Sequence, residues 1–187
     1  LLEQVFKDRN ILKFEGIEGL DEKKQKANAM SQLAAYVQEP LLAKMAVESW
    51  SEFFQLLAKY TKKGTWTIYL EELQWLASYE DTLIAELKYV WDNFLRHNSN
   101  LLLILCGSSP SFMIDHVLHS KALYNRSQHE FHLKEFTLPE TKEFLKNRSN
   151  KEVMDAYLTV GGVPEYLKWV TTESSVFLSI AKNSFST

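Results

Sequence analysis

The sequence predicts an α/β fold in which helices connect the strands of a parallel sheet. Residues 66–70 and 101–106 form continuous apolar runs without polar alternation, and both are too short for typical helices. Such runs are characteristic of strands buried on both faces. Between them, residues 78–95 carry apolar side chains at helical spacing after a Ser and Asp start signal. A strand, a helix and a second strand in this order indicate a crossover between parallel neighbours.

The elements before the first of these strands follow from local signals. Residues 1–9 read as the end of a helix, and residues 11–15 as a short strand. Asp21 is placed to cap the next helix, which Pro40 terminates because proline cannot continue a helix.

Another helix follows before residue 66. Ser49 and Glu52 have the spacing of a capping box, and the apolar stripe behind them ends before Gly64. The chain therefore alternates helices and strands up to about residue 135, as expected for a sheet with crossover helices.

The remaining segments are mostly helical. A short helix is expected from Ser111 to about Leu118, and residues 130–133 are a possible further strand. Thr137 and Glu140 again have capping-box spacing. Helices are predicted at residues 138–147, 151–160, 164–170 and from 174 onward. We therefore expect a core at residues 1–135, followed by a small helical region at residues 136–187.

Composition limits the possible functions. The 187 residues carry a net charge of -3 and are 45% hydrophobic, so they can bury a sizeable core but do not favour a nucleic-acid surface. The longest apolar run is too short to cross a bilayer. Cys106 is the only cysteine, which excludes an internal disulfide and favours a cytoplasmic setting. Because the chain begins without Met and opens in a helical pattern, we expect it to be part of a longer protein.

Polar residues follow both predicted central strands. Glu71 and Glu72 come directly after the first strand, and Ser108 and Ser109 follow the second. Parallel strands present their carboxyl ends at one edge, where open α/β folds bind ligands. One acid there can hold Mg²⁺ through water and the other can orient an attacking water, while a hydroxyl contacts that water or a phosphate. The spacing therefore favours phosphoryl transfer.

Four segments resemble a known family. The segment TIYLEELQWL (67–76) resembles the Walker B strand of P-loop NTPases, and LLLILCGSS (101–109) resembles the sensor 1 strand. Together with ALYNR (122–126) and GGVPEYL (161–167), they are similar to the archaeal-type ATPases within the AAA+ and STAND-like NTPases. The resemblance implies a P-loop NTPase core, truncated at its N-terminus, and a helical lid.

The resemblance also implies roles for individual residues. Glu71 occupies the position of the acid associated with Mg²⁺, and Glu72 that of the catalytic glutamate. Ser108 takes the sensor 1 position, and Arg126 matches an arginine that contacts phosphate. ATP and Mg²⁺ are the implied ligands.

The lid turn is implied by Gly161, Gly162 and Pro164, which match family residues that approach the nucleotide base.

The sequence departs from the pattern of the family in two respects. Glu71 replaces the usual Asp, and no GxxxxGK[ST] phosphate-binding loop occurs in the sequence. We expect that loop to lie upstream of residue 1.

Three function classes stay open. The first is an ATP-binding and ATP-hydrolysing module whose isolated 187 residues are inactive. The second is an interaction or regulatory module that keeps the NTPase fold without hydrolysis. The third, a nucleic-acid-binding helical module, is disfavoured by the negative net charge. Self-association or a protein partner is compatible with the first two, and no membrane is expected.

Overall fold

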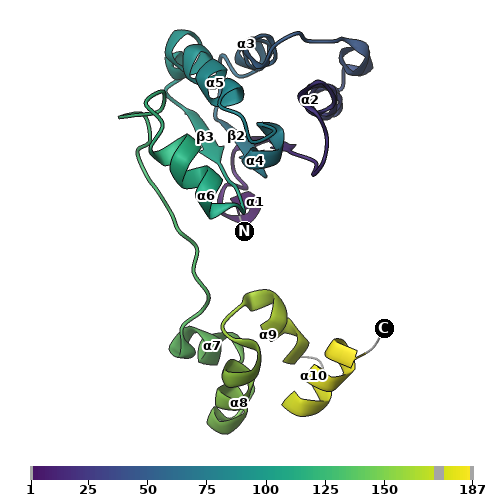
Figure 1. Cartoon of the computed structure of the whole chain (residues 1–187), viewed down its shortest axis with the longest axis vertical. Helices are drawn as coiled ribbons and strands as arrows, with labels where there is room; N and C mark the ends of the chain where they lie inside the picture. The colour runs from purple at the N-terminus through teal and green to yellow at the C-terminus, as the bar shows by residue number, and fades with distance from the viewer. Residues whose placement is uncertain (1, 171–174, 186–187) are drawn as a thin grey trace. The chain divides into compact units, whose positions relative to one another are not determined.

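The computed structural model describes residues 2–170 and 175–185, which separate into two units, Leu1–Gln128 and His129–Thr187. The second unit is drawn in green to yellow in Figure 1. Each unit has a hydrophobic core of its own.

The first unit alternates helices and strands. Its elements are α1 (Leu2–Val5), β1 (Asn10–Glu15), α2 (Glu22–Val37), the 3-10 helix η1 (Pro40–Lys44), α3 (Trp50–Tyr60), β2 (Trp66–Glu71), α4 (Leu73–Leu76), α5 (Thr82–Asn93), the 3-10 helix η2 (Leu95–His97), β3 (Leu101–Leu105), α6 (Pro110–Phe112) and the π-helix η3 (Met113–Leu118).

The sheet of this unit is parallel and has the order β1-β2-β3. Trp66 lies opposite Asn10 on one side and Leu101 on the other, so the carboxyl ends of the strands share one edge. This confirms the predicted parallel sheet and the predicted pairing of the two apolar runs. Within the described residues, β3 has a partner strand on only one side.

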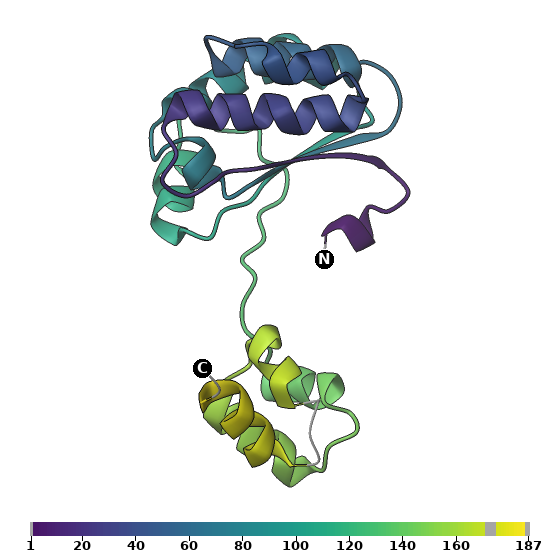
Figure 2. The same cartoon turned by 90° about the vertical axis from the view of Figure 1, so that its right-hand side faces the viewer.

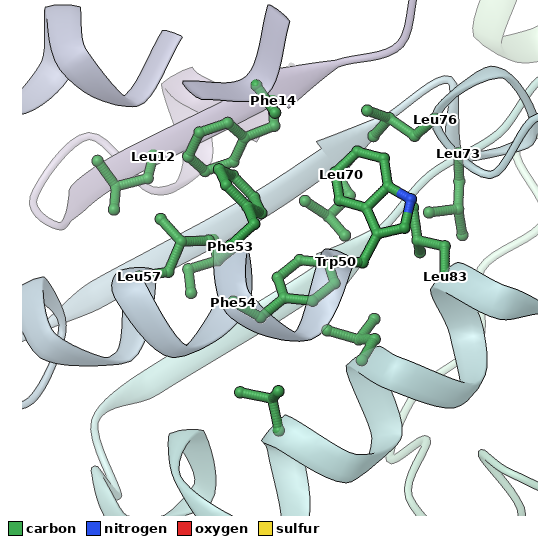
Figure 3. Close-up of a cluster of buried hydrophobic side chains, with 14 of the residues drawn as sticks. Leu12, Phe14, Trp50, Phe53, Phe54, Leu57, Leu70, Leu73, Leu76 and Leu83 are labelled. Atoms are coloured by element: carbon green, nitrogen blue, oxygen red, sulfur yellow. The ribbon is translucent and has the colours of Figure 1, made fainter. Parts of the chain in front are cut away.

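Helices α2, α3 and α5 cover one face of the sheet (Figures 1 and 2). Figure 3 shows the aromatic centre of the core beneath α3, where the ring of Phe53 contacts Phe14 edge-on with centroids 5.1 Å apart. Trp50 and Phe54 stack beside it at 6.0 Å. Burying each of these large side chains stabilises the fold by roughly 1.5–3 kcal/mol.

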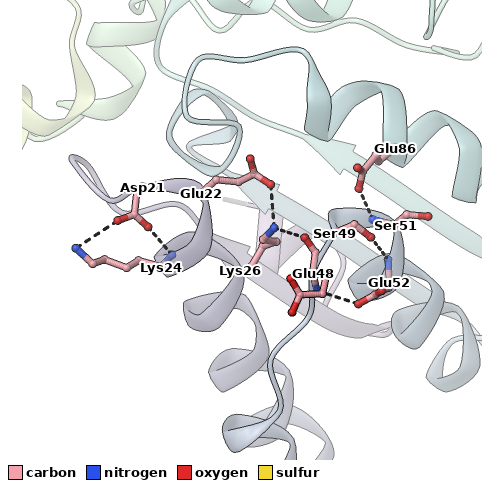
Figure 4. Close-up of polar contacts among 9 residues, drawn as sticks. All are labelled: Asp21, Glu22, Lys24, Lys26, Glu48, Ser49, Ser51, Glu52 and Glu86. Atoms are coloured by element: carbon pink, nitrogen blue, oxygen red, sulfur yellow. Dashed lines mark hydrogen bonds and ion pairs between the residues drawn. The ribbon is translucent and has the colours of Figure 1, made fainter.

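Predicted caps fix the starts of two helices. Asp21 Oδ1 accepts a hydrogen bond from the Lys24 amide at 2.8 Å, and Ser49 Oγ accepts one from the Glu52 amide at 3.1 Å. Both pairs are drawn in Figure 4. The starts of α2 and α3 were therefore predicted from sequence at the correct residues.

Polar side chains also join these helices to one another (Figure 4). The buried Lys26 donates to Glu22 at 3.0 Å and to the Glu48 carbonyl at 2.6 Å, so α2 holds the loop that leads into α3. The Ser51 amide donates to Glu86 Oε2 at 2.6 Å, which connects α3 to α5.

The second unit is helical in its described part. Its helices are α7 (Leu138–Phe144), α8 (Asn150–Val160), α9 (Pro164–Val170) and α10 (Val176–Phe185). The predicted capping box at Thr137 and Glu140 is present. The predicted start of the last helix at residue 174 lies outside the described residues.

Residues 130–133 are not a strand, so that prediction was wrong. Phe131 and Leu133 are 85% and 77% exposed, and the segment pairs with none of the three strands. An alternating pattern forms a strand only where a neighbour supplies ladder hydrogen bonds and covers the apolar face.

No helix among the described residues has the length and hydropathy needed to cross a bilayer.

Candidate functional site

The candidate site lies where β2 and β3 end. Glu72 follows β2 with φ 50° and ψ 52°, a left-handed conformation that is uncommon for a non-glycine residue. The turn at Glu72 leads directly into α4, whose first residue Leu73 donates its amide to the Cys106 carbonyl at 3.0 Å. On the other side, the Gly16 amide donates to the Glu71 carbonyl at 3.0 Å. Backbone hydrogen bonds with the residues that directly follow β1 and β3 therefore hold the turn that carries Glu72.

Glu72 and Ser108 are in direct contact. Ser108 Oγ donates to Glu72 Oε2 at 2.6 Å, which confirms that these residues lie at the same edge. Ser109 has a different position, because it precedes α6 and its hydroxyl lies 3.4 Å from Ser111 Oγ.

A third member of the contact is Gln74, which no sequence motif indicates. Its Nε2 donates to Glu72 Oε2 at 2.6 Å and to Ser108 Oγ at 3.0 Å. The side chain comes from α4 and is buried, with 1% exposed. The sequence feature that could have indicated Gln74 is its position as a polar amide in the otherwise apolar segment LQWL, two residues after Glu72.

Glu71 has different partners from Glu72. Tyr69 Oη donates to Glu71 Oε1 at 2.7 Å, and Lys13 forms an ion pair with Glu71 and another with Glu15. Burial raises the pKa of Glu71, but hydrogen bonds from Lys13 and Tyr69 outweigh burial and leave the pKa below its usual value. The same carboxylate raises the pKa of Lys13.

Arg126 is engaged with α5. Its Nε donates to Asp92 Oδ1 at 2.9 Å and its Nη2 donates to Asp92 Oδ2 at 2.7 Å, a bidentate pair. Lys88 contacts the same carboxylate at 3.1 Å. The predicted contact of Arg126 with phosphate stays a prediction, and it requires this guanidinium to exchange Asp92 for the nucleotide.

Gly161, Gly162 and Pro164 lie together in the second unit. Gly161 ends α8 with φ 71°, and Pro164 begins α9. The Phe136 amide donates to the Gly162 carbonyl at 2.8 Å, and a Cβ atom on Gly162 would lie 1.9 Å from the Phe136 carbonyl oxygen. These residues form the turn expected between two helices, and their approach to a nucleotide base stays a prediction.

The model of one protein family, described as an ATPase domain predominantly from Archaea, matches residues 4–170. The chain belongs to this family of archaeal-type ATPase domains. No curated protein sequence matches it. The resemblance seen in the four sequence segments is therefore confirmed, and the domain is an α/β member of the P-loop NTPase superfamily.

Membership in the ATPase family implies use of a nucleotide and usually of Mg²⁺. The donor set around Glu71 does not fit a metal ion. Both carboxylate oxygens have partners, and one of these partners is the Lys13 ammonium, which repels a cation. Among the described residues no group of three or more His, Cys, Asp or Glu side chains could hold a metal.

The ion pair between Arg126 and Asp92 should make the stability of the domain depend on pH. Hydrogen bonds from Arg126 keep the pKa of Asp92 well below its usual value, and Lys88 adds to the effect. A lowered pKa stabilises the fold above the ordinary Asp pKa of about 4, and this stability is lost as the pH falls. Asp92→Asn should therefore be less stable than the wild type at pH 7, and the difference should shrink as the pH falls below about 4. Urea unfolding at a series of pH values measures this, and a pH-independent difference would contradict it.

Proposed function

We propose that this domain supplies the hydrolytic side of an ATPase site, with Glu72 as the general base and Ser108 at the sensor 1 position. The observation that carries the proposal is the 2.6 Å contact between Ser108 Oγ and Glu72 Oε2 at the carboxyl edge of the parallel strands. Open α/β folds bind their ligands outside this edge. The match to an ATPase family supports phosphate as the group that is bound there.

In the proposed reaction, the oxygen of a water molecule attacks the γ-phosphorus of ATP. The bond from that phosphorus to the β,γ-bridging oxygen breaks, which releases ADP and forms inorganic phosphate. Glu72 Oε1 accepts the proton of the water, because the other oxygen, Oε2, already accepts bonds from Gln74 and Ser108. Phosphoryl transfer relies on positioning and electrostatics, so this edge of the sheet must place one water and one phosphate.

Affinity for the phosphates must come from another part of the site. In P-loop proteins the backbone amides of a Gly-rich loop and its Lys bind the phosphates, and no GxxxxGK[ST] motif occurs among the 187 residues. We propose that this loop lies upstream of residue 1, as the family resemblance implies. The strands of the complete domain would then be arranged as in AAA+ proteins. Glu71 and Glu72 add negative charge and repel a polyphosphate on their own.

Binding of Mg-ATP tests the proposal that the phosphate-binding loop lies upstream. Calorimetric titration with Mg-ATP should show binding to the full-length protein and little or none to the 187-residue chain at the same concentration. In this proposal most of the phosphate affinity comes from the backbone amides and Lys of an upstream loop. Affinity in the micromolar range (roughly -8 kcal/mol) for the isolated chain would contradict the proposal.

A second candidate function is a nucleotide-binding regulatory module that does not hydrolyse ATP. The Lys13 ion pair favours it, because this pair engages the acid that the family resemblance assigns to Mg²⁺. Binding of Mg-ATP without release of phosphate would establish this alternative. In either case we propose a cytoplasmic protein in which Arg126 contacts the nucleotide and whose nucleotide state is recognised by a second copy or by a protein partner.

A further inference from the structure

Gln74 is a buried polar residue beside Glu72. Its side chain is 1% exposed, and its Oε1 is buried without a hydrogen-bond partner among the described residues. A buried amide with an unpaired oxygen costs free energy, so packing alone would favour an apolar residue such as Leu or Met at this position. A local feature that lowers stability is expected chiefly at functional sites.

The amide of Gln74 has little room to move. A Cβ atom placed on Gly107 would lie 2.7 Å from Gln74 Oε1 and 2.7 Å from Met113 Sδ, so the absence of a side chain at Gly107 provides the space for both groups. The α4 backbone is held as well, because the Leu73 amide donates to the Cys106 carbonyl at 3.0 Å. Gln74 therefore presents its Nε2 from a fixed position.

The hydrogen bonds of Gln74 and Ser108 converge on a single oxygen of the base. Glu72 Oε2 accepts from Gln74 Nε2 and from Ser108 Oγ, both at 2.6 Å, and Gln74 Nε2 also contacts Ser108 Oγ at 3.0 Å. Within the described chain no hydrogen bond reaches Glu72 Oε1. The three side chains thus fix the plane of the carboxylate and leave Oε1 free to accept a proton.

We propose that Gln74 is a positioning residue, whose amide holds Glu72 Oε2 so that Oε1 faces the attacking water. This inference rests on the proposed ATPase function. It adds a residue whose removal lowers the rate of hydrolysis without weakening ATP binding, since Gln74 acts only through Glu72. A general base must stay within hydrogen-bond reach of its proton, and small misplacements lower the rate strongly.

Gln74→Met in the full-length protein tests the proposal. Methionine keeps the length of the side chain and removes both hydrogen-bond donors. The kcat for Mg-ATP should fall roughly 10- to 100-fold with KM unchanged. Combined with Glu72→Gln, the same change should cause no further loss, because its effect requires the Glu72 carboxylate.

Gln25→Met provides a matched control. Gln25 is also fully buried, but its amide contacts the Ile17 backbone, where Nε2 donates to the carbonyl at 2.6 Å. This variant should lower stability and leave kcat unchanged. A folded Gln74→Met variant with wild-type kcat, or a further loss in the Glu72→Gln background, would overturn the positioning role.

Nuclear magnetic resonance of the 187-residue chain gives a readout without catalysis. The Gln74 side-chain amide protons should resonate downfield of those of exposed glutamines, and Ser108→Ala should shift them. Amide signals at the exposed position would overturn the inference directly. A wild-type protein without turnover would overturn the proposed function and the catalytic role of Gln74 together, whereas turnover with an unaffected Gln74→Met would overturn the inference alone.

Discussion

Glu72→Gln in the full-length protein should leave Mg-ATP binding close to wild type and lower turnover by about 10²–10⁴-fold. Glutamine keeps the shape of the side chain and can still contact Ser108, so the 2.6 Å approach of the two residues need not be lost. It cannot take a proton from the attacking water, because a neutral amide oxygen is a very weak base. Binding is measured by calorimetry and turnover by release of inorganic phosphate.

Glu71→Gln is the matched comparison, since it removes the neighbouring carboxylate. The change deprives Lys13 of one of its two acidic partners and leaves the contacts of Glu72 intact. We expect a smaller loss of turnover than for Glu72→Gln. If Glu72→Gln keeps full turnover while Glu71→Gln abolishes it, the two roles are reversed.

Gly162→Ala should disrupt the packing of the second unit. The added Cβ would lie 1.9 Å from the carbonyl oxygen of Phe136 and 2.8 Å from its carbonyl carbon, and these backbone atoms cannot rotate away as a side chain can. The hydrogen bond from the Phe136 amide to the Gly162 carbonyl would be lost as the segments separate. The cost should be about 3 kcal/mol, at the upper end for overpacking. Hydrogen exchange should then accelerate across α8 and α9.

Gly161→Ala is the control for this change. Among the described residues its Cβ would meet only Glu135 Oε2, at 3.1 Å, and that carboxylate can move. The remaining cost comes from the backbone at φ 71° and ψ -166°, a region that residues other than glycine rarely adopt, and should be roughly 1–3 kcal/mol. Equal exchange rates in the two variants would contradict the proposed clash at Gly162.

Much of the fold followed from short-range signals. The runs at residues 66–70 and 101–106 predicted the central strands, and caps such as Asp21 predicted helix starts. Parallel strands end at a common edge, so the contact of Glu72 with Ser108 could be predicted without coordinates.

The wrong prediction and the contacts that were not predicted depend on residues that are distant in sequence. Residues 130–133 have a strand-like pattern, but a strand needs a neighbour, which the pattern cannot reveal. The pairing of Glu71 with Lys13 depends on the register of β1 against β2, where Lys13 lies opposite Tyr69. Gln74 was missed because a single amide in an apolar segment gives no sign of what it contacts.

The outer edge of β3 affects how the chain behaves at high concentration. Leu101–Leu105 is an uncharged stretch of five aliphatic residues, and within the described residues only β2 pairs with it. A strand with unpaired backbone groups and no charged or proline side chains is a template for intermolecular ladders. Samples of the isolated chain should therefore tend to precipitate through β3, and a charged residue placed along this edge would improve solubility.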